Sequence, residues 1–243
     1  GKGGTGKTFA SVNLAVSAAG WAGGPGGQTP DIAGGQTPEQ PQGRPVHPFR
    51  YVDCDVEEPN GHLFLQPEAV CAEPVSVMVP AYDVSLCDGC RICTNFCRFN
   101  ALAFVKNRPY VFDEVCHSCL GCILLCPQKA LTEKKRIVGE IQSGESGTVR
   151  VVTGIMNTGE ESGVPIIKRL IARANAESGR PIFVDCPPGS ACIVMESIRD
   201  ADFCILTAEP TVFGAENLAM VYELVRLFKK PYGVVLNKCL DGD

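Results

Sequence analysis

The distribution of apolar residues predicts alternating strands and helices. Two segments repeat apolar residues at helical spacing, one from residue 9 to 19 and one beginning near residue 214. Strands that alternate with helices favour a parallel sheet covered on both faces. Four short apolar stretches have the length of buried strands: residues 49–52, 182–185, 203–207 and 232–236. One face of the later helix is apolar through Leu218, Val221, Tyr222, Val225 and Phe228.

The first eight residues, Gly-Lys-Gly-Gly-Thr-Gly-Lys-Thr, match the phosphate-binding P-loop pattern G-x4-G-K-[ST]. The Lys7 ammonium group is expected to reach the β- and γ-phosphates, and the Thr8 hydroxyl to bind magnesium. A glycine-rich linker is the alternative, but the helical pattern that follows favours a P-loop. We expect a strand before residue 1, so the chain looks truncated at its start. The predicted phosphate-binding residues are Gly3, Gly4, Thr5, Gly6, Lys7 and Thr8.

Acidic residues follow two of the predicted strands. Asp53 and Asp55 come after the strand at 49–52, and Asp185 ends the strand at 182–185. Ligands of open α/β sheets bind at the carboxyl ends of the strands. These three carboxylates are therefore candidate magnesium-binding or catalytic groups.

Eight of the 14 cysteines form two runs with the spacing C-x2-C-x2-C-x3-C. Each cysteine of the second run lies 29 residues after its counterpart, which indicates an internal duplication. Disulfide frameworks do not require this spacing, so a reducing compartment is expected. The two runs are Cys87, Cys90, Cys93, Cys97 and Cys116, Cys119, Cys122, Cys126.

The segment from about residue 84 to 133 resembles bacterial ferredoxins with two 4Fe-4S clusters. In those proteins the fourth cysteine of each run ligates the other cluster. Arg98 departs from the family, which has proline there, but that proline ligates nothing. Two zinc sites are the alternative, although they leave the third and fourth cysteines of each run unexplained. His117 is expected to be a solvated loop residue. The resemblance implies Cys87, Cys90, Cys93 and Cys126 for one cluster, and Cys116, Cys119, Cys122 and Cys97 for the other.

Lys2, directly after the first glycine, makes the P-loop similar to that of the MinD, ParA and nitrogenase iron protein family. The resemblance implies a homodimer on ATP in which Lys2 reaches the partner's phosphates. An exposed loop lysine is the alternative. The resemblance to this family also implies that Asp55 orients the attacking water, and that Asp53 lies in the outer magnesium shell. Asp185 is expected to hold magnesium and Asn237 to recognise adenine.

The whole pattern resembles MinD-superfamily ATPases that contain an inserted ferredoxin domain. The implied fold is an α/β P-loop NTPase domain with a parallel sheet, interrupted by an α+β ferredoxin-like module with two clusters. The ATPase domain takes residues 1–82 and 135–243, and the insert takes 83–134. Residues 20–48, rich in Gly, Pro and Gln, predict a disordered loop. The family's last strand and helix are expected beyond residue 243.

Six further cysteines lie outside the two runs. Those beside apolar stretches are expected to behave as small hydrophobic residues. The other two, Cys186 and Cys192, flank the second switch, where related proteins share a cluster across the dimer. Cys192 is therefore either a ligand of a bridging cluster or a buried structural thiol. The four beside apolar stretches are Cys54, Cys71, Cys204 and Cys239.

Net charge and hydropathy indicate which classes of partner are not expected. The 22 basic and 27 acidic residues give a formal net charge of -5, so no nucleic-acid partner is expected. No apolar run has the length of a membrane span, and no signal peptide is recognised, which predicts a cytoplasmic protein.

Two functions follow as hypotheses. One is an ATP-hydrolysing electron carrier with ATP, Mg2+ and two 4Fe-4S clusters as cofactors, and an unknown redox partner. The other is a cluster assembly or carrier ATPase that delivers clusters to an apo-acceptor protein. A positioning ATPase like MinD is disfavoured because the chain ends before a C-terminal amphipathic anchor.

Overall fold

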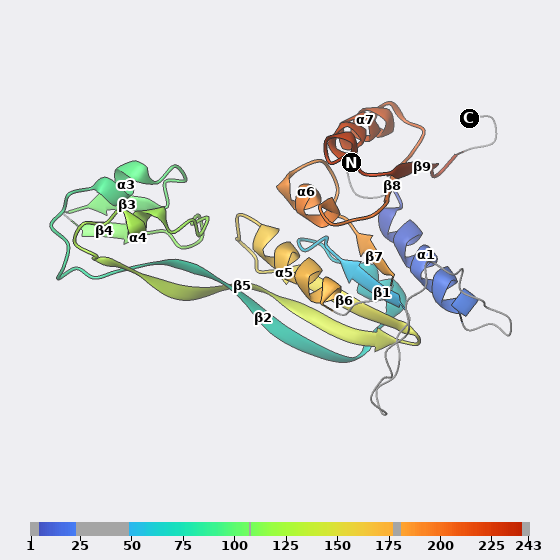
Figure 1. The fold of residues 1–243 in the computed structure, drawn as a ribbon, viewed down its shortest axis with the longest axis horizontal. Helices are drawn as coiled ribbons and strands as arrows, with labels where there is room; N and C mark the ends of the chain where they lie inside the picture. The colour runs from blue at the N-terminus through green and yellow to red at the C-terminus, as the bar shows by residue number, and fades with distance from the viewer. Residues whose placement is uncertain (1–4, 23–48, 107, 177–180, 240–243) are drawn as a thin grey trace.

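The computed structural model describes residues 5–22, 49–106, 108–176 and 181–239. Its centre is a five-stranded sheet in the order β2-β5-β6-β1-β7 (Figure 1). Strand β1 therefore has a neighbour on each side, with β7 beside it at one edge of this sheet. The strands are β1 (Phe49–Asp53), β2 (Glu68–Tyr82), β5 (Leu131–Ser146), β6 (Val149–Met156) and β7 (Ile182–Asp185).

This sheet is parallel on one side and antiparallel on the other. β1 pairs in parallel with β6 and β7, whereas β5 runs antiparallel to both β6 and β2. Only Gly147 and Thr148 separate β5 from β6, and Gly147 has a positive φ of 56°. So short a connection joins only antiparallel strands. The predicted parallel arrangement is thus confirmed for β1 and β7, whereas β2, β5 and β6 were not predicted as strands, and β5 pairs in the antiparallel sense. The predicted strands at 203–207 and 232–236 do not join this sheet.

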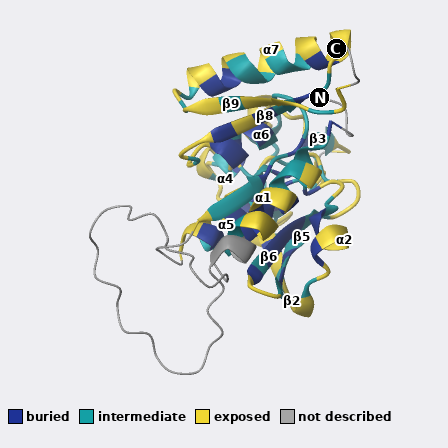
Figure 2. Cartoon of the chain, turned by 90° about the vertical axis from the view of Figure 1, so that its right-hand side faces the viewer, coloured by how far each residue is buried: buried dark blue, intermediate teal, exposed yellow. Residues whose placement is uncertain are grey.

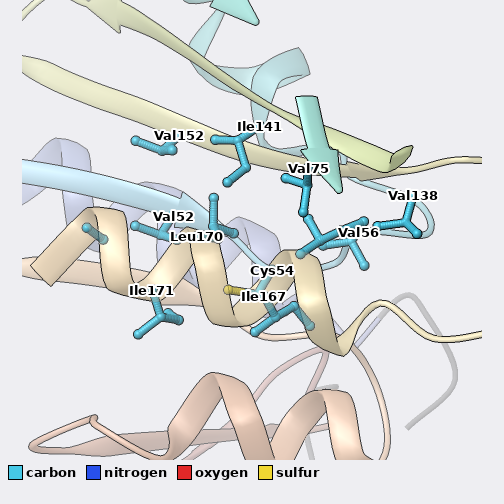
Figure 3. Close-up of a cluster of buried hydrophobic side chains, with 12 residues drawn as sticks. Val52, Cys54, Val56, Val75, Val138, Ile141, Val152, Ile167, Leu170 and Ile171 are labelled. Carbon is cyan, nitrogen blue, oxygen red and sulfur yellow. The ribbon is translucent and has the colours of Figure 1, made fainter. Parts of the chain in front are cut away.

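Helices cover both faces of the sheet, as the alternation of elements predicted. α1 (Lys7–Ala22) and α2 (Gly61–Leu65) pack on one face, where Val12 and Ala15 contact the buried Tyr51. α5 (Val164–Asn175) and α6 (Cys192–Ile198) cover the other. Because side chains alternate along a strand, Val52 and Cys54 belong to this second core. Figure 3 shows this core, in which α5 contributes Ile166, Ile167, Leu170, Ile171 and Ala174.

A smaller parallel pair, β8 (Cys204–Ala208) and β9 (Tyr232–Leu236), forms a separate sheet with α7 (Val212–Leu227). The Thr211 hydroxyl caps α7 by accepting a hydrogen bond from the Gly214 amide at 2.9 Å. The predicted apolar face of α7 is confirmed, because its residues pack against α6 and β8. The opposite faces of α7 and β9 are largely exposed (Figure 2).

β2 and β5 form a long two-stranded arm that projects from the rest of the protein (Figure 1). Their pairing extends from Glu68 opposite Glu145 to Tyr82 opposite Leu131. The segment between them, 83–130, carries both cysteine runs at the far end of the arm. Residues 131–134 of the predicted insert lie in β5 itself. The elements at the far end are α3 (Ile92–Phe96), β3 (Leu102–Val105), β4 (Arg108–Val111) and α4 (Gly121–Leu124).

The structure also bears on the predicted loop at residues 20–48 and on membrane-spanning helices. The disordered loop was expected from residue 20, but α1 continues to Ala22. A single glycine costs a helix only about 1 kcal/mol relative to alanine, so Gly20 does not end it. The rest of that loop, residues 23–48, lies outside the described residues. Among the described helices, none is long and apolar enough to cross a membrane.

The core beneath α5 should account for much of the stability of the sheet. Leu170 is fully buried there, so Leu170→Ala is expected to lower the free energy of unfolding by about 2–5 kcal/mol. Leu227→Ala is the matched control, because Leu227 is 72% exposed, and it should change that free energy by less than about 0.5 kcal/mol. Urea denaturation of both variants measures the difference, and equal losses would contradict the assigned core.

Candidate functional site

The described part of the P-loop begins at Thr5 and leads directly into α1. Gly6 has a positive φ of 90°, a conformation that favours glycine. The Gly6 carbonyl accepts the first hydrogen bond of the helix, from the Ala10 amide at 2.9 Å. Lys7 and Thr8 therefore occupy the first turn of α1, whose free amides favour an anion. The predicted residues Lys2, Gly3 and Gly4 lie outside the described residues.

The two strand-ending aspartates lie side by side. In the parallel pairing of β1 with β7, Asp53 is the direct partner of Asp185. Both carboxylates are buried. The two carboxylate oxygens of Asp53 accept hydrogen bonds from the Gly61 amide at 2.9 Å and the Asp55 amide at 3.1 Å. The loop after β1 is thus held around this carboxylate.

Burial changes the proton affinity of this pair. Desolvation is the main cause that raises the pKa of Asp53 to about 7, and the negative charge of Asp185 adds to it. Burial also raises the pKa of Asp185, opposed by hydrogen bonds from Thr8 and Tyr51 and by the charge of Lys7. The structure therefore brings Lys7, Thr8 and Asp185 together, as expected for a P-loop site.

Asp55 lies nearer to solvent. Desolvation is the main cause that raises its pKa to about 6, and the nearby Lys7 charge opposes the rise. The negative charges of Asp185, Glu57 and Glu58 act in the same direction as burial. Asp55 is thus an acid beside the P-loop lysine that is close to half protonated at a pH near 6.

Tyr51 is a site residue that sequence reasoning missed. Its hydroxyl donates a hydrogen bond to Asp185 Oδ2 at 2.8 Å from within β1. The signal was a tyrosine two residues before a strand-ending acid, since a buried phenol hydroxyl usually finds a partner. The partner itself depends on the pairing of β1 with β7, which the sequence does not specify.

Asn237 follows β9 and contacts the P-loop backbone. Its amide nitrogen Nδ2 donates to the Thr5 carbonyl at 3.1 Å. A Cβ atom added to Gly6 would lie 2.2 Å from the same nitrogen, so the glycine permits this close approach. Lys238 next to it pairs with Glu209 at 3.3 Å. The expected adenine-recognition role of Asn237 stays a prediction.

A second group of candidate residues surrounds two cavities at the far end of the arm. The first cysteine cavity has an empty volume of about 490 Å³, including open solvent, and the second about 350 Å³. Each takes three cysteines from one run and the fourth from the other. The cysteines of the first are Cys97, Cys116, Cys119 and Cys122, and those of the second are Cys87, Cys90, Cys93 and Cys126.

The local backbone reflects the duplication of 29 residues. Arg91 and Leu120, directly before α3 and α4, both adopt the left-handed conformation. Asn100 and Lys129 form another such pair at the same offset, with φ values of 53° and 51°. The two halves therefore fold alike, which places their cysteines equivalently and supports the inferred duplication.

The thiols of the cysteine cavities are partly withdrawn from water. Desolvation raises the pKa of Cys122 to about 11, with the nearby Cys116 contributing. Backbone amides approach two of the sulfurs, because Gly89 N lies 3.4 Å from Cys87 Sγ and Ala130 N lies 3.3 Å from Cys126 Sγ. Within the described ranges, no three His, Cys, Asp or Glu side chains form a group that could hold a metal ion.

The other cysteines divide into buried and exposed thiols. Cys54 and Cys204 are buried, as predicted, whereas Cys71 and Cys239 are exposed. Cys71 lies on β2, at the edge of the sheet, where the neighbouring Val70 is also exposed, so its apolar context did not imply burial. Cys192 is exposed at the first position of α6, so it is not a buried structural thiol.

Cys186 lies directly after Asp185 and is half-buried. Desolvation is the main cause that raises its pKa to about 12, and the negative charge of Asp185 adds to the rise. A bridging cluster at Cys192 stays a prediction.

Comparison with known proteins identifies the fold. No family model matches the chain. It is 25% identical over 194 residues to uncharacterized protein MJ0579 of Methanocaldococcus jannaschii, covering 77% of this chain and 68% of that protein. It is 27% identical over 188 residues to MJ0578 of the same organism, covering 77% and 66%. The chain thus spans about two thirds of the length of these relatives.

Among solved structures, the chain resembles the cell division ATPase MinD of Pyrococcus furiosus. The TM-score is 0.50 at 16% identity, and the match covers 100% of this chain and 71% of that one. The chain therefore has a mixed α/β fold of the MinD P-loop type.

The contact between Asn237 and the P-loop can be tested through Gly6. Gly6→Ala should destabilise the protein through its positive φ, by about 1–2 kcal/mol, and also by displacing the Asn237 amide. Gly159→Ala is the matched control, because Gly159 has a φ of 87° with open space around it. Urea denaturation should show about 1 kcal/mol more loss for Gly6→Ala. In an Asn237→Ala background the excess should vanish, and an excess that persists would contradict the contact.

Proposed function

We propose that this protein binds and hydrolyses ATP and couples the nucleotide-driven closure of a homodimer to electron transfer through two 4Fe-4S clusters. The observation that carries the proposal is the combination of a MinD-type P-loop fold with two four-cysteine cavities on one arm. The arm extends directly from the sheet that presents Asp53 and Asp185. One polypeptide thus links a nucleotide site to a redox module.

In this proposal the P-loop and the paired aspartates hold magnesium-ATP. Thr8, Asp53 and Asp185 present oxygen atoms, the ligands that magnesium prefers. Lys7 neutralises phosphate charge, and Asp55 beside it orients the attacking water. Lys2 reaches the nucleotide of the partner in the homodimer. The amides of residues 3–8 bind the phosphates, and Asn237 contacts adenine.

The cysteine cavities fit iron-sulfur clusters better than zinc. Three of the four thiols in each cavity come from one C-x2-C-x2-C run, whereas zinc sites built on C-x2-C pairs would leave the third and fourth cysteines of each run unexplained. Each cavity is lined by four thiols, the number of ligands that a 4Fe-4S cluster takes. The grouping supports the crossed ligand sets expected from ferredoxins. When bound, the clusters would supply one-electron redox chemistry.

Val56 offers a route from the nucleotide site to the arm. It directly follows Asp55, is almost fully buried, and packs in one core with Val75 of β2 and Val138 of β5 (Figure 3). Its carbonyl accepts a hydrogen bond from the Met156 amide at 2.8 Å. A shift of the loop carrying Asp55 would therefore change the packing at the base of the arm.

The glycines around Val56 make this contact tight. A Cβ atom at Gly163 would lie 2.4 Å from one Val56 methyl group, and a Cβ atom at Gly154 would lie 2.7 Å from the other. Close-packed cores transmit displacements because they contain little free space. Val56 is thus placed to move with β6 and the start of α5.

Ion pairs also connect the arm to α5 and to the loop that precedes it. Arg136 of β5 forms a two-pronged pair with Glu160 at 2.6 Å, and Glu73 of β2 pairs with Arg169 and Arg173 of α5 at 2.6 and 2.7 Å. The Arg136 pair is well shielded, whereas the Glu73 pairs are partly exposed and individually weak. Together these ion pairs connect the base of the arm to α5 and to the loop before it, so a shift of α5 would also move the base.

A cluster carrier that delivers its cargo to an apo-protein is the second candidate function. The exposure of Cys90 and Cys119, one thiol in each cavity, favours it. An exposed ligand is open to attack by the thiols of an acceptor protein, which is how a cluster can be passed on. An electron carrier, in contrast, should keep its clusters through repeated redox cycles.

Anaerobic purification of the full-length protein tests the proposed function. We expect eight irons and eight sulfides per chain, and electron paramagnetic resonance spectra that change when magnesium-ATP is added. Zinc in place of iron would refute the cluster assignment, and unchanged spectra would refute the coupling. Loss of iron to an apo-ferredoxin on ATP addition would favour the carrier function. An iron content above 16 per dimer would indicate a further cluster at Cys192.

Removing methyl groups from Val56 should weaken the coupling. Val56→Ala is expected to cost about 1.5 kcal/mol of stability and to reduce the ATP-induced spectral change, while ATP hydrolysis continues. Val212→Ala is the matched control, because Val212 is 76% exposed on α7, far along the chain from the arm. Hydrolysis rates and spectra are compared on the same samples. A normal spectral response in Val56→Ala would exclude this route.

A further inference from the structure

The ring of Tyr51 is enclosed between the sheet and the helices on one face. The residue has no exposed surface. It packs against Val12 and Ala15 of α1 and Leu65 at the end of α2. A phenol hydroxyl buried without a partner is strongly unfavourable, so the position is tolerated only with a hydrogen bond.

The Tyr51 hydroxyl finds its partner in the nucleotide site. It donates to Asp185 Oδ2 at 2.8 Å, and it also interacts with the Ser11 side chain of α1. Thr8, one turn earlier in α1, hydrogen-bonds the same Asp185 carboxylate. A hydrogen bond to a charged acceptor is stronger than one between neutral groups. The carboxylate is thus held from β1 and from α1.

Gly61 makes room for this arrangement. A Cβ atom at Gly61 would lie 2.3 Å from the Tyr51 hydroxyl oxygen and 2.4 Å from a ring carbon. The Gly61 amide donates to Asp53 Oδ2 at 2.9 Å, so the same residue contacts the second buried aspartate through its backbone. The absence of a side chain at Gly61 therefore leaves the space that the Tyr51 ring and hydroxyl occupy.

We propose that Tyr51 is a positioning residue for the magnesium site, whose hydroxyl fixes the orientation of the Asp185 carboxylate. The inference rests on the proposed nucleotide-binding function and names a residue of that site that the P-loop pattern does not include. Magnesium requires near-ideal octahedral geometry, so its affinity depends on the orientation of the nearby carboxylate. Removal of a group that orients a ligand typically weakens metal binding 10–100-fold.

Tyr51→Phe in the full-length protein removes the hydroxyl and keeps the ring. The probe is a fluorescent N-methylanthraniloyl derivative of ATP, titrated with magnesium and, separately, without it. We expect the magnesium concentration at half-maximal binding to rise about 10-fold, with magnesium-free nucleotide binding unchanged. Tyr110→Phe is the matched control, because Tyr110 is 52% exposed on β4, and it should leave both titrations unchanged.

Gly61→Ala tests the position of the Tyr51 hydroxyl without removing it. The added methyl group displaces the ring while the hydroxyl is retained, so the magnesium midpoint should rise here as well. Thermal melting of each variant separates positioning from packing. A lower melting temperature with an unchanged magnesium midpoint, or the failure of both variants to fold, would assign Tyr51 to the core alone and overturn the inference.

The wild-type titration separates this inference from the proposed function. If the wild-type protein does not bind the fluorescent nucleotide with magnesium, the proposed function fails. If the wild type binds it and both variants match the wild type in magnesium dependence, only the role of Tyr51 fails.

Discussion

The parallel pairing of β1 with β7 is the constraint on which the proposed nucleotide site depends. It sets Asp53 directly beside Asp185 in a region shielded from water, and burial raises the pKa of both carboxyl groups. Two neighbouring carboxylates in such a place favour a proton or a cation. Lys7 supplies part of the compensating charge. A bound cation would complete it, so ligand binding and folding stability are linked at this site.

The arm is a second consequence of how the sheet is built. A ribbon of two strands is marginally stable by itself, so β2 and β5 need support from the rest of the protein. The support comes from the pairing of β5 with β6, from the core around Val56, and from the ion pairs to α5 and Glu160. All of these contacts lie at the base. A displacement of the base would therefore be carried along the paired strands to the far end.

Sequence reasoning recovered the features that depend on local chemistry. The strands at 182–185 and 232–236 have the predicted bounds, and the eight cysteines group around cavities in the crossed sets. Apolar pattern was enough for the strands, and cysteine spacing was enough to identify the two runs, whereas the crossed sets came from the resemblance to two-cluster ferredoxins. The nucleotide and cluster roles of these residues stay predictions.

The features that sequence reasoning missed depend on contacts between distant segments. β2 and β5 lie 48 residues apart along the chain and carry no short turn that would mark them as partners. Tyr51 and Asp185 meet only because β7 pairs with β1, and Asn237 reaches Thr5 across 232 residues. Cys71 shows the limit of local hydropathy, since the edge of a sheet leaves apolar neighbours exposed.

The exchange of the fourth cysteine between the two runs has a consequence for biosynthesis. Cys97 completes a cavity built by the second run, and Cys126 completes one built by the first. Neither copy of the duplicated unit can form a four-thiol cavity alone. During translation, the cavity lined by Cys87 lacks its fourth thiol until Cys126 has been synthesised. A premature stop codon between the two runs would leave both cavities incomplete.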